Sequence, residues 1–62
     1  MNKTEIVRKT VLSRLKTQFR VFRNAVYLDL NIGDLGPQFQ ALERSGLVKT
    51  VRVKGAIAYE YI

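Results

Sequence analysis

The side chains in this sequence that could do chemistry are mainly cationic. Among 62 residues, 11 are Lys or Arg and 5 are Asp or Glu, so the formal net charge is +6. This balance favours polyanionic partners, nucleic acid before an anionic membrane surface. A charge that serves only solubility stays open as the alternative. Most of the excess lies in residues 1–23, where Glu5 is the single acidic residue, whereas residues 24–48 are net acidic and residues 49–62 net basic. A polyanion is therefore expected to dock on the two terminal segments more than on the centre.

Groups for catalysis or metal binding are scarce. The sequence contains no His and no Cys, so the usual general base and the commonest metal ligands are missing. Ser13 and Ser45 have no base partner in any recognisable motif. The segment Gly33-Asp34-Leu35-Gly36 is too short and too acidic for a phosphate-binding loop. We therefore expect no enzyme activity, no metal, no cofactor and no small-molecule substrate.

The length of the chain predicts one domain over residues 1–62. The hydrophobic share of 47% is sufficient for a core, but a chain this short, without disulfides, is marginally stable and gains from dimerisation. No apolar run approaches the roughly 18 residues that cross a bilayer, and no long apolar stretch follows the N-terminus as in a signal peptide. The expected location is the cytoplasm, with no membrane partner.

Residues 34–45 show the signals of a helix with a defined start and end. Asp34 is a suitable N-terminal cap, and Pro37 falls in the first turn, where its missing N–H has no intrahelical partner to lose. Gly46 suits the left-handed position after a helix, and Leu47 is the apolar residue expected to fold back on the helix end. The sequence therefore predicts a helix over 34–45 that leads into a strand.

This predicted helix has an apolar face and a polar face. Leu35, Phe39 and Leu42 recur at spacings of four and three, so they share the inward face. The opposite face and its edge carry glutamine and arginine, which read adenine and guanine edges through paired hydrogen bonds. A polar face that contacts only solvent stays open as the alternative. The candidate base-reading residues are Gln38, Gln40, Ala41 and Arg44.

The N-terminal segment also has helical spacing, with Thr4 as a suitable cap. A helix is predicted over residues 4–17 from an apolar stripe made of Val7, Val11 and Leu15, with Leu12 and Phe19 beside it. The cations of residues 1–23 are possible phosphate contacts, with solvation as the alternative; those we select are Lys3, Lys9, Arg14, Arg20 and Arg23.

Residues 19–30 fit two structures. As a helix, Phe22, Ala25 and Val26 line one side; as a strand, Val26, Leu28 and Leu30 alternate with their neighbours. Residues 31–34 form a turn by composition.

After Gly46 the period changes to two, which predicts strands over 47–53 and 56–62 with a break at Lys54-Gly55. A two-residue loop pairs Lys49 with Glu60, and their opposite charges favour this register. The same register pairs Val53 with Ala56, Val51 with Ala58 and Thr50 with Tyr59. A bulged or longer loop stays open, because Lys-Gly is a weaker turn than Asn-Gly. The candidate phosphate contacts are Lys49, Arg52 and Lys54, whereas Tyr59 and Tyr61 are expected in the core or in a subunit interface.

The order of helix, Gly-Leu-Val, strand, basic tip and strand resembles the winged helix-turn-helix DNA-binding domains of bacterial and phage repressors. In that family an alanine packs inside the second helix and the third helix ends in Leu-Glu-x-x-Gly-Leu-Val. Here Asp29 replaces a usual glycine, and Gly36-Pro37 shortens the third helix. The residues that carry the resemblance are Ala25, Leu28, Leu30, Leu35, Phe39 and Leu42-Glu43-Arg44-Ser45-Gly46-Leu47-Val48.

The resemblance implies an α+β fold that is mainly α: a three-helix core with its second helix near 22–29, followed by a two-stranded hairpin wing. It further implies that the helix over 34–45 enters the major groove and that the wing contacts phosphates or the minor groove. We therefore expect a small sequence-specific regulator of transcription, from a bacterium, phage or plasmid, that binds double-stranded DNA as a homodimer. The alternatives are a winged-helix module that binds protein and not DNA, and a basic RNA-binding domain.

Overall fold

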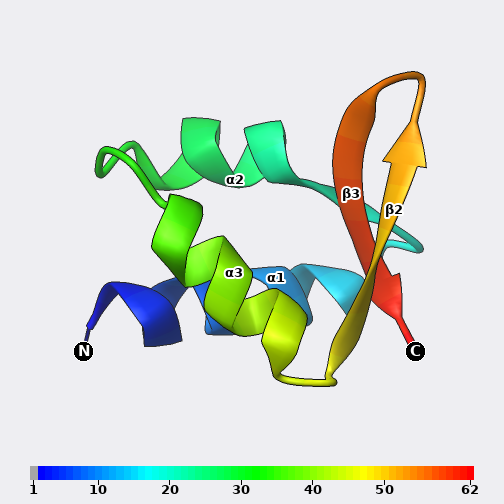
Figure 1. The fold of residues 1–62 in the computed structure, drawn as a ribbon, viewed down its shortest axis with the longest axis horizontal. Helices are drawn as coiled ribbons and strands as arrows, with labels where there is room; N and C mark the ends of the chain where they lie inside the picture. The colour runs from blue at the N-terminus through cyan, green and yellow to red at the C-terminus, as the bar shows by residue number, and fades with distance from the viewer. Residues whose placement is uncertain (1) are drawn as a thin grey trace.

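The computed structural model describes residues 2–62, which form three helices and a three-stranded antiparallel sheet (Figure 1). In chain order the elements are α1 (Lys3–Leu15), β1 (Val21–Phe22), α2 (Arg23–Leu30), α3 (Gly36–Arg44), β2 (Val48–Val53) and β3 (Ala56–Tyr61). The strand order is β1-β3-β2, so β3 is the central strand. The α+β class with three helices is as predicted, and the structure adds a third strand to the expected hairpin.

Helix α1 begins earlier and ends earlier than predicted. Its cap is Asn2 and not Thr4, because the Asn2 side chain accepts a hydrogen bond of 2.9 Å from the backbone N–H of Glu5. The helix ends at Leu15, so Phe19 lies beyond it and is 76% exposed instead of joining the apolar stripe. The stripe itself is confirmed, with Val7, Val11 and Leu15 buried.

The ambiguous stretch from residue 19 to residue 30 divides into a strand and a helix. Val21 and Phe22 pair with Tyr59 and Ala58 as β1, and the chain then turns directly into α2. A strand of two residues is too short to show a period in the sequence, which is why β1 was not predicted. Along α2 only Val26 is fully buried; Leu28 is 82% exposed, so the inward position implied for it by the resemblance is wrong. Two residues apart on a helix lie about 200° apart, so these two side chains cannot share a face.

Helix α3 begins two residues later than predicted. Leu35 occupies the cap position, but the Asp34 carboxylate still accepts a hydrogen bond of 2.9 Å from the Gly36 N–H at the start of the helix. Pro37 lies in the first turn, as predicted.

The end of α3 is partly as predicted. Gly46 has a left-handed φ of 79°. The prediction for Leu47 is wrong: this side chain is 45% exposed and Val48 is buried in its place. The reason is that β2 starts at Val48, and strand alternation turns that side chain inward and its neighbour outward.

The β2–β3 hairpin has the predicted register, including Lys49 opposite Glu60, Thr50 opposite Tyr59 and Val53 opposite Ala56. Its loop is the tight two-residue form. Lys54 and Gly55 both have left-handed φ values, of 51° and 84°, as a type I′ turn requires.

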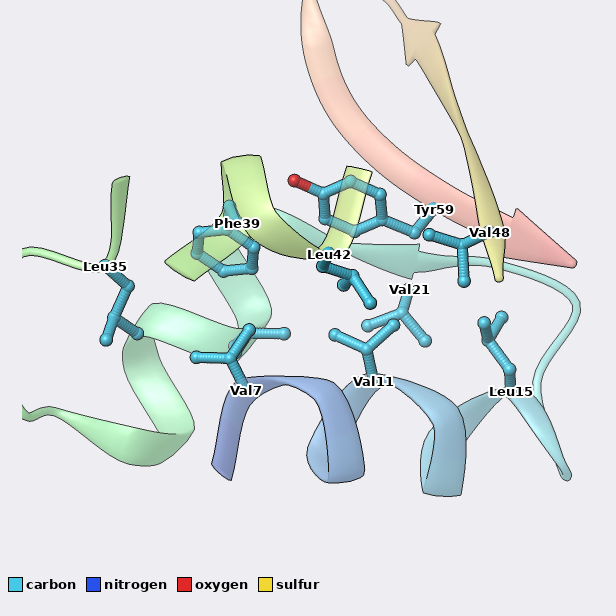
Figure 2. Packing of buried hydrophobic residues seen from close by; sticks show 10 residues of the cluster. Val7, Val11, Leu15, Val21, Leu35, Phe39, Leu42, Val48 and Tyr59 are labelled. Carbon is cyan, nitrogen blue, oxygen red and sulfur yellow. The ribbon is translucent and has the colours of Figure 1, made fainter. Parts of the chain in front are cut away.

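The core lies between α1, α3 and the sheet (Figure 2). Val7, Val11 and Leu15 point from α1 toward side chains of the sheet and of α3. Phe39 and Tyr59 are fully buried, and their rings stack with centroids 5.7 Å apart and an interplanar angle of 15°. This packing places α3 against the central strand. Within residues 2–62, no helix has both the length and the apolar character needed to cross a membrane.

Candidate functional site

The solvent-facing side of α3 carries three of the four candidate base-reading residues. Gln40, Ala41 and Arg44 are exposed, on the side opposite the buried Leu35, Phe39 and Leu42. The fourth candidate, Gln38, is half-buried at the edge of this face. Its amide oxygen is buried and accepts no hydrogen bond from the residues that the structure describes. The exposed face therefore presents one amide and one guanidinium group as hydrogen-bonding side chains.

The hairpin separates the three candidate phosphate contacts. Arg52 lies opposite Ile57 and so shares a sheet face with Thr50 and Tyr59, the face against which the core packs. Lys54 is exposed in the turn. Lys49 lies on the other face of the hairpin, with its ammonium 3.8 Å from the Glu60 carboxylate. Arg52 is therefore on the same side of the sheet as α3, and Lys49 is not.

Three of the five N-terminal candidate cations are engaged in ion pairs within the protein. Arg14 pairs with Asp29, Arg20 with Glu60 and Arg23 with Glu43, and all three arginines are partly buried. Lys3 and Lys9 are exposed. The sequence could not separate these two sets, because the partners lie far away along the chain: Arg20 and Glu60 are 40 residues apart, with Nε and Nη2 of the arginine 2.8 and 2.6 Å from one carboxylate oxygen.

A polar network joins α2, α3 and β3. The Tyr59 hydroxyl donates to Oε2 of Glu43 at 2.7 Å and accepts from Nε of Arg23 at 3.0 Å. Nη2 of Arg23 donates to the same carboxylate oxygen at 2.5 Å. The guanidinium also lies over the Phe39 ring, 5.0 Å from its centroid. We refer to Arg23, Glu43 and Tyr59 as the α3 network.

Burial and hydrogen bonding in the α3 network shift the pKa values of Tyr59 and Arg23. Burial raises the pKa of the Tyr59 hydroxyl far above its ordinary value, and the bond to Glu43 raises it further, so the group stays a neutral donor. Burial acts to lower the pKa of Arg23, but the hydrogen bonds to Tyr59 and Glu43 outweigh this effect and raise the pKa.

The α3 network was not predicted from the sequence, in which Arg23 was expected to contact phosphate and Glu43 formed part of the Leu-Glu-x-x-Gly-Leu-Val motif. One signal was present: Glu43 follows Phe39 by four residues, which puts an acid beside the buried stripe of α3.

A shallow cleft of about 440 Å³ lies between α1 and α2. It is lined by Lys9, Thr10, Ser13, Arg14, Asp29 and Leu30. Its single carboxylate already pairs with Arg14. Across residues 2–62, no group of three or more acidic, His or Cys side chains is arranged to hold a metal ion.

The exposed side of α3 thus presents Gln40 and Arg44, and the hairpin presents Arg52 on the sheet face nearer α3 and Lys54 in its turn. Donor and cationic side chains of this kind suit a partner rich in anionic and acceptor oxygens. Comparison with known proteins gives no match to a family model, to a curated protein or to a solved structure.

Proposed function

We propose that this protein binds double-stranded DNA as a winged helix-turn-helix protein, with α3 in the major groove and the β2–β3 hairpin against the adjacent backbone. One observation carries the proposal. Arg52 projects from the sheet face that contains Tyr59, and the Tyr59 hydroxyl is bonded to Glu43 of α3. Arg52 therefore extends from the side of the sheet that faces α3, and this placement supports contact of the hairpin and α3 with one duplex.

The order of elements supports the same proposal. A helix, a short strand, two further helices and a hairpin follow one another, and the first strand pairs with the last (Figure 1). This is the arrangement expected for a winged helix, in which the third helix is presented on the surface and the hairpin flanks it. Helix α3 has nine residues, sufficient for two to three turns in the groove.

The distribution of charge supports contact with phosphates. Arg44, Arg52 and Lys54 make no ion pair with any residue of the 2–62 segment, whereas Arg14, Arg20 and Arg23 do. Cations without protein partners are free to replace counterions on DNA, and this replacement makes binding depend on salt. Arg44, on the exposed face of α3, is the residue we assign to a base edge, and Arg52 and Lys54 are those we assign to phosphates.

A regulatory role in a bacterium, phage or plasmid follows if the DNA contacts are sequence-specific. Repressors of this size reach sufficient specificity as dimers on paired half-sites. Exposed apolar side chains are available for a subunit contact near the end of β3: Phe19, Leu47 and Ile62 are 76%, 45% and 78% exposed.

A protein-interaction module without DNA binding is the second candidate. The observation that favours it is Leu28, which is 82% exposed on α2, with Ile32 four residues further on at 38%. A protein partner would cover these side chains, whereas a duplex on α3 and the hairpin leaves them in solvent.

The experiment that separates the two candidates is selection of bound fragments from random duplex DNA, followed by affinity measurements on the selected duplex, an unrelated duplex and an RNA of the same sequence. The DNA proposal predicts a recurring sequence motif and preference for the selected duplex. Absence of binding at low salt contradicts it and favours the interaction module, and preference for RNA favours the RNA-binding alternative.

A further inference from the structure

The exposed side chains of α3 depend on how this helix is rotated about its own axis. Its apolar contacts with the core are made by Leu35, Phe39 and Leu42. Apolar contacts have no directional preference and tolerate small rotations and repacking. Hydrogen bonds weaken steeply when their angles change, so they define the rotation of a helix more sharply.

The directional contacts between α3 and the sheet include those of the α3 network. Oε2 of Glu43 accepts from both Arg23 and Tyr59, and Tyr59 in turn accepts from Arg23, which closes a three-membered ring of hydrogen bonds. Tyr59 belongs to the central strand, and its ring is fixed by full burial and by stacking on Phe39. Arg23 is the first residue of α2. One carboxylate on α3 is therefore held from two other elements.

We infer that Arg23, Glu43 and Tyr59 are positioning residues that set the rotation of α3 relative to the hairpin, and thereby the sequence selectivity of the proposed DNA-binding surface. This inference rests on the proposed function and identifies which buried groups make that function selective. None of the three residues needs to touch DNA.

The geometry of a helix shows why a small rotation matters. An atom about 5 Å from the helix axis moves by roughly 2 Å when the helix rotates by about 20°. A hydrogen bond to a base edge tolerates a range of only about 0.5 Å between donor and acceptor. Glu43 is next to Arg44 and three residues after Gln40 on the same helix. A rotation of α3 that follows the loss of its hydrogen bonds therefore displaces both of these side chains. Phosphate contacts from long, flexible side chains are less sensitive to the same movement.

The second arginine–glutamate pair of the sheet provides a matched control. Glu60 is 6% exposed and accepts two bonds from Arg20, but it lies on the face of the hairpin turned away from Tyr59 and α3. Tyr61 supplies the control for the hydroxyl group, because its hydroxyl donates to the Leu12 carbonyl oxygen at 3.3 Å and is not part of the α3 network. Changes at these two residues affect stability without touching α3.

The test compares Tyr59→Phe and Glu43→Ala with Tyr61→Phe and Glu60→Gln in the full chain, each well below its unfolding temperature. Affinity is measured for a selected duplex and for an unrelated duplex. We expect Tyr59→Phe and Glu43→Ala to weaken binding to the selected duplex about five- to tenfold, which corresponds to the loss of one hydrogen bond to a base edge. Binding to the unrelated duplex should weaken less than about twofold. Glu43→Gln keeps an acceptor and should restore part of the selectivity. The two controls should leave the ratio of the two affinities unchanged.

Residual dipolar couplings of the α3 amides relative to those of the sheet measure the rotation directly and need no DNA. We expect them to change in Tyr59→Phe and Glu43→Ala and not in the controls. Selective binding by the parent with an unchanged ratio in both variants overturns the inference and leaves the proposed function intact. If the parent selects no duplex, the proposed function fails, and so does the role of the α3 network in selectivity. Unchanged couplings in both variants overturn the role of the network in setting the rotation.

Discussion

Lys49 and Arg52 point to opposite faces of the β2–β3 hairpin. Lys49 lies opposite Glu60 and Arg52 opposite Ile57, in a register without bulges. The two cations lie on different sides of the sheet because they are three residues apart, and side chains alternate between the two faces of a strand. Only the Arg52 side is shared with Tyr59 and, through its hydroxyl, with α3. The two cations therefore have different neighbours, and Lys49 provides the control for cations that face α3 or lie in the turn.

The first prediction uses two lysines of the same hairpin. Lys54→Ala removes a cation from the turn and should weaken binding to every duplex about equally, with a salt slope smaller by about one. Lys49→Ala removes the same charge from the far face and should change neither the affinity nor the slope measurably. Affinities at four or more salt concentrations give the slope. Equal losses in both variants would show that net charge, and not this surface, governs binding.

The second prediction concerns alkaline pH. Because the pKa of Tyr59 is raised, the folded protein keeps this proton where the unfolded chain, with an ordinary tyrosine pKa of about 10, begins to lose it. The stability contributed by the protonated hydroxyl is complete below about pH 10 and is lost as the pH rises above it. The free energy of unfolding, from urea titrations at increasing pH, should therefore fall in this range.

The fall should be smaller in Tyr59→Phe than in the parent, since phenylalanine has no proton to lose. A Tyr59→Phe curve that coincides with that of the parent would contradict the assigned role of burial at Tyr59.

The third prediction separates two leucines that the sequence pattern treats alike. Leu35 is fully buried, whereas Leu28 is 82% exposed. Leu35→Ala should lower the free energy of unfolding by about 2–5 kcal/mol, which is enough to unfold much of so small a domain. Leu28→Ala should change it by no more than about 0.5 kcal/mol. Chemical unfolding of both variants is the measurement, and a large loss in Leu28→Ala would mean that α2 packs with a different face inward.

The fourth prediction concerns self-association. Sedimentation of the parent at high micromolar concentration should show a dimer. Leu47→Asp places a charge among the exposed apolar residues near the end of β3 and should give a monomer. Leu28→Asp, an equal change on α2, should leave the dimer intact. A parent that stays monomeric at this concentration removes the dimer from the proposal.

Strong local signals made much of the fold predictable. The apolar stripes of α1 and α3 follow from the helical period of the sequence, and the structure has them. The left-handed Gly46 follows from a glycine placed after a helix, and the hairpin register from a two-residue loop with opposite charges at residues 49 and 60. The strand β1 could not be predicted, because two residues carry no period and its formation depends on β3, more than 30 residues away. The pairing of Arg20 with Glu60 could not be predicted for the same reason, because the two residues are far apart in the sequence.

The candidate site was predictable to a similar degree. Helical spacing brought Gln40, Ala41 and Arg44 to one exposed face, as the structure has them. It could not show that Gln38 turns toward the protein or that Arg23 is used inside it, because both depend on how helices pack. Charge counts in the sequence also gave Arg23 and Arg52 equal weight, whereas one is paired and the other makes no ion pair within residues 2–62.

The proposal that α3 reads DNA bases through its exposed face depends above all on Arg44, and Arg44→Ala removes that side chain. The measurement is affinity for a selected duplex and for an unrelated duplex, with Lys49→Ala as the charge-matched control and thermal unfolding to confirm that both variants are folded. We expect Arg44→Ala to lose about 1–3 kcal/mol of binding free energy on the selected duplex and much less on the unrelated one. An Arg44→Ala protein that discriminates between the two duplexes as well as the parent does, or a parent that binds neither duplex at low salt, would contradict the proposal.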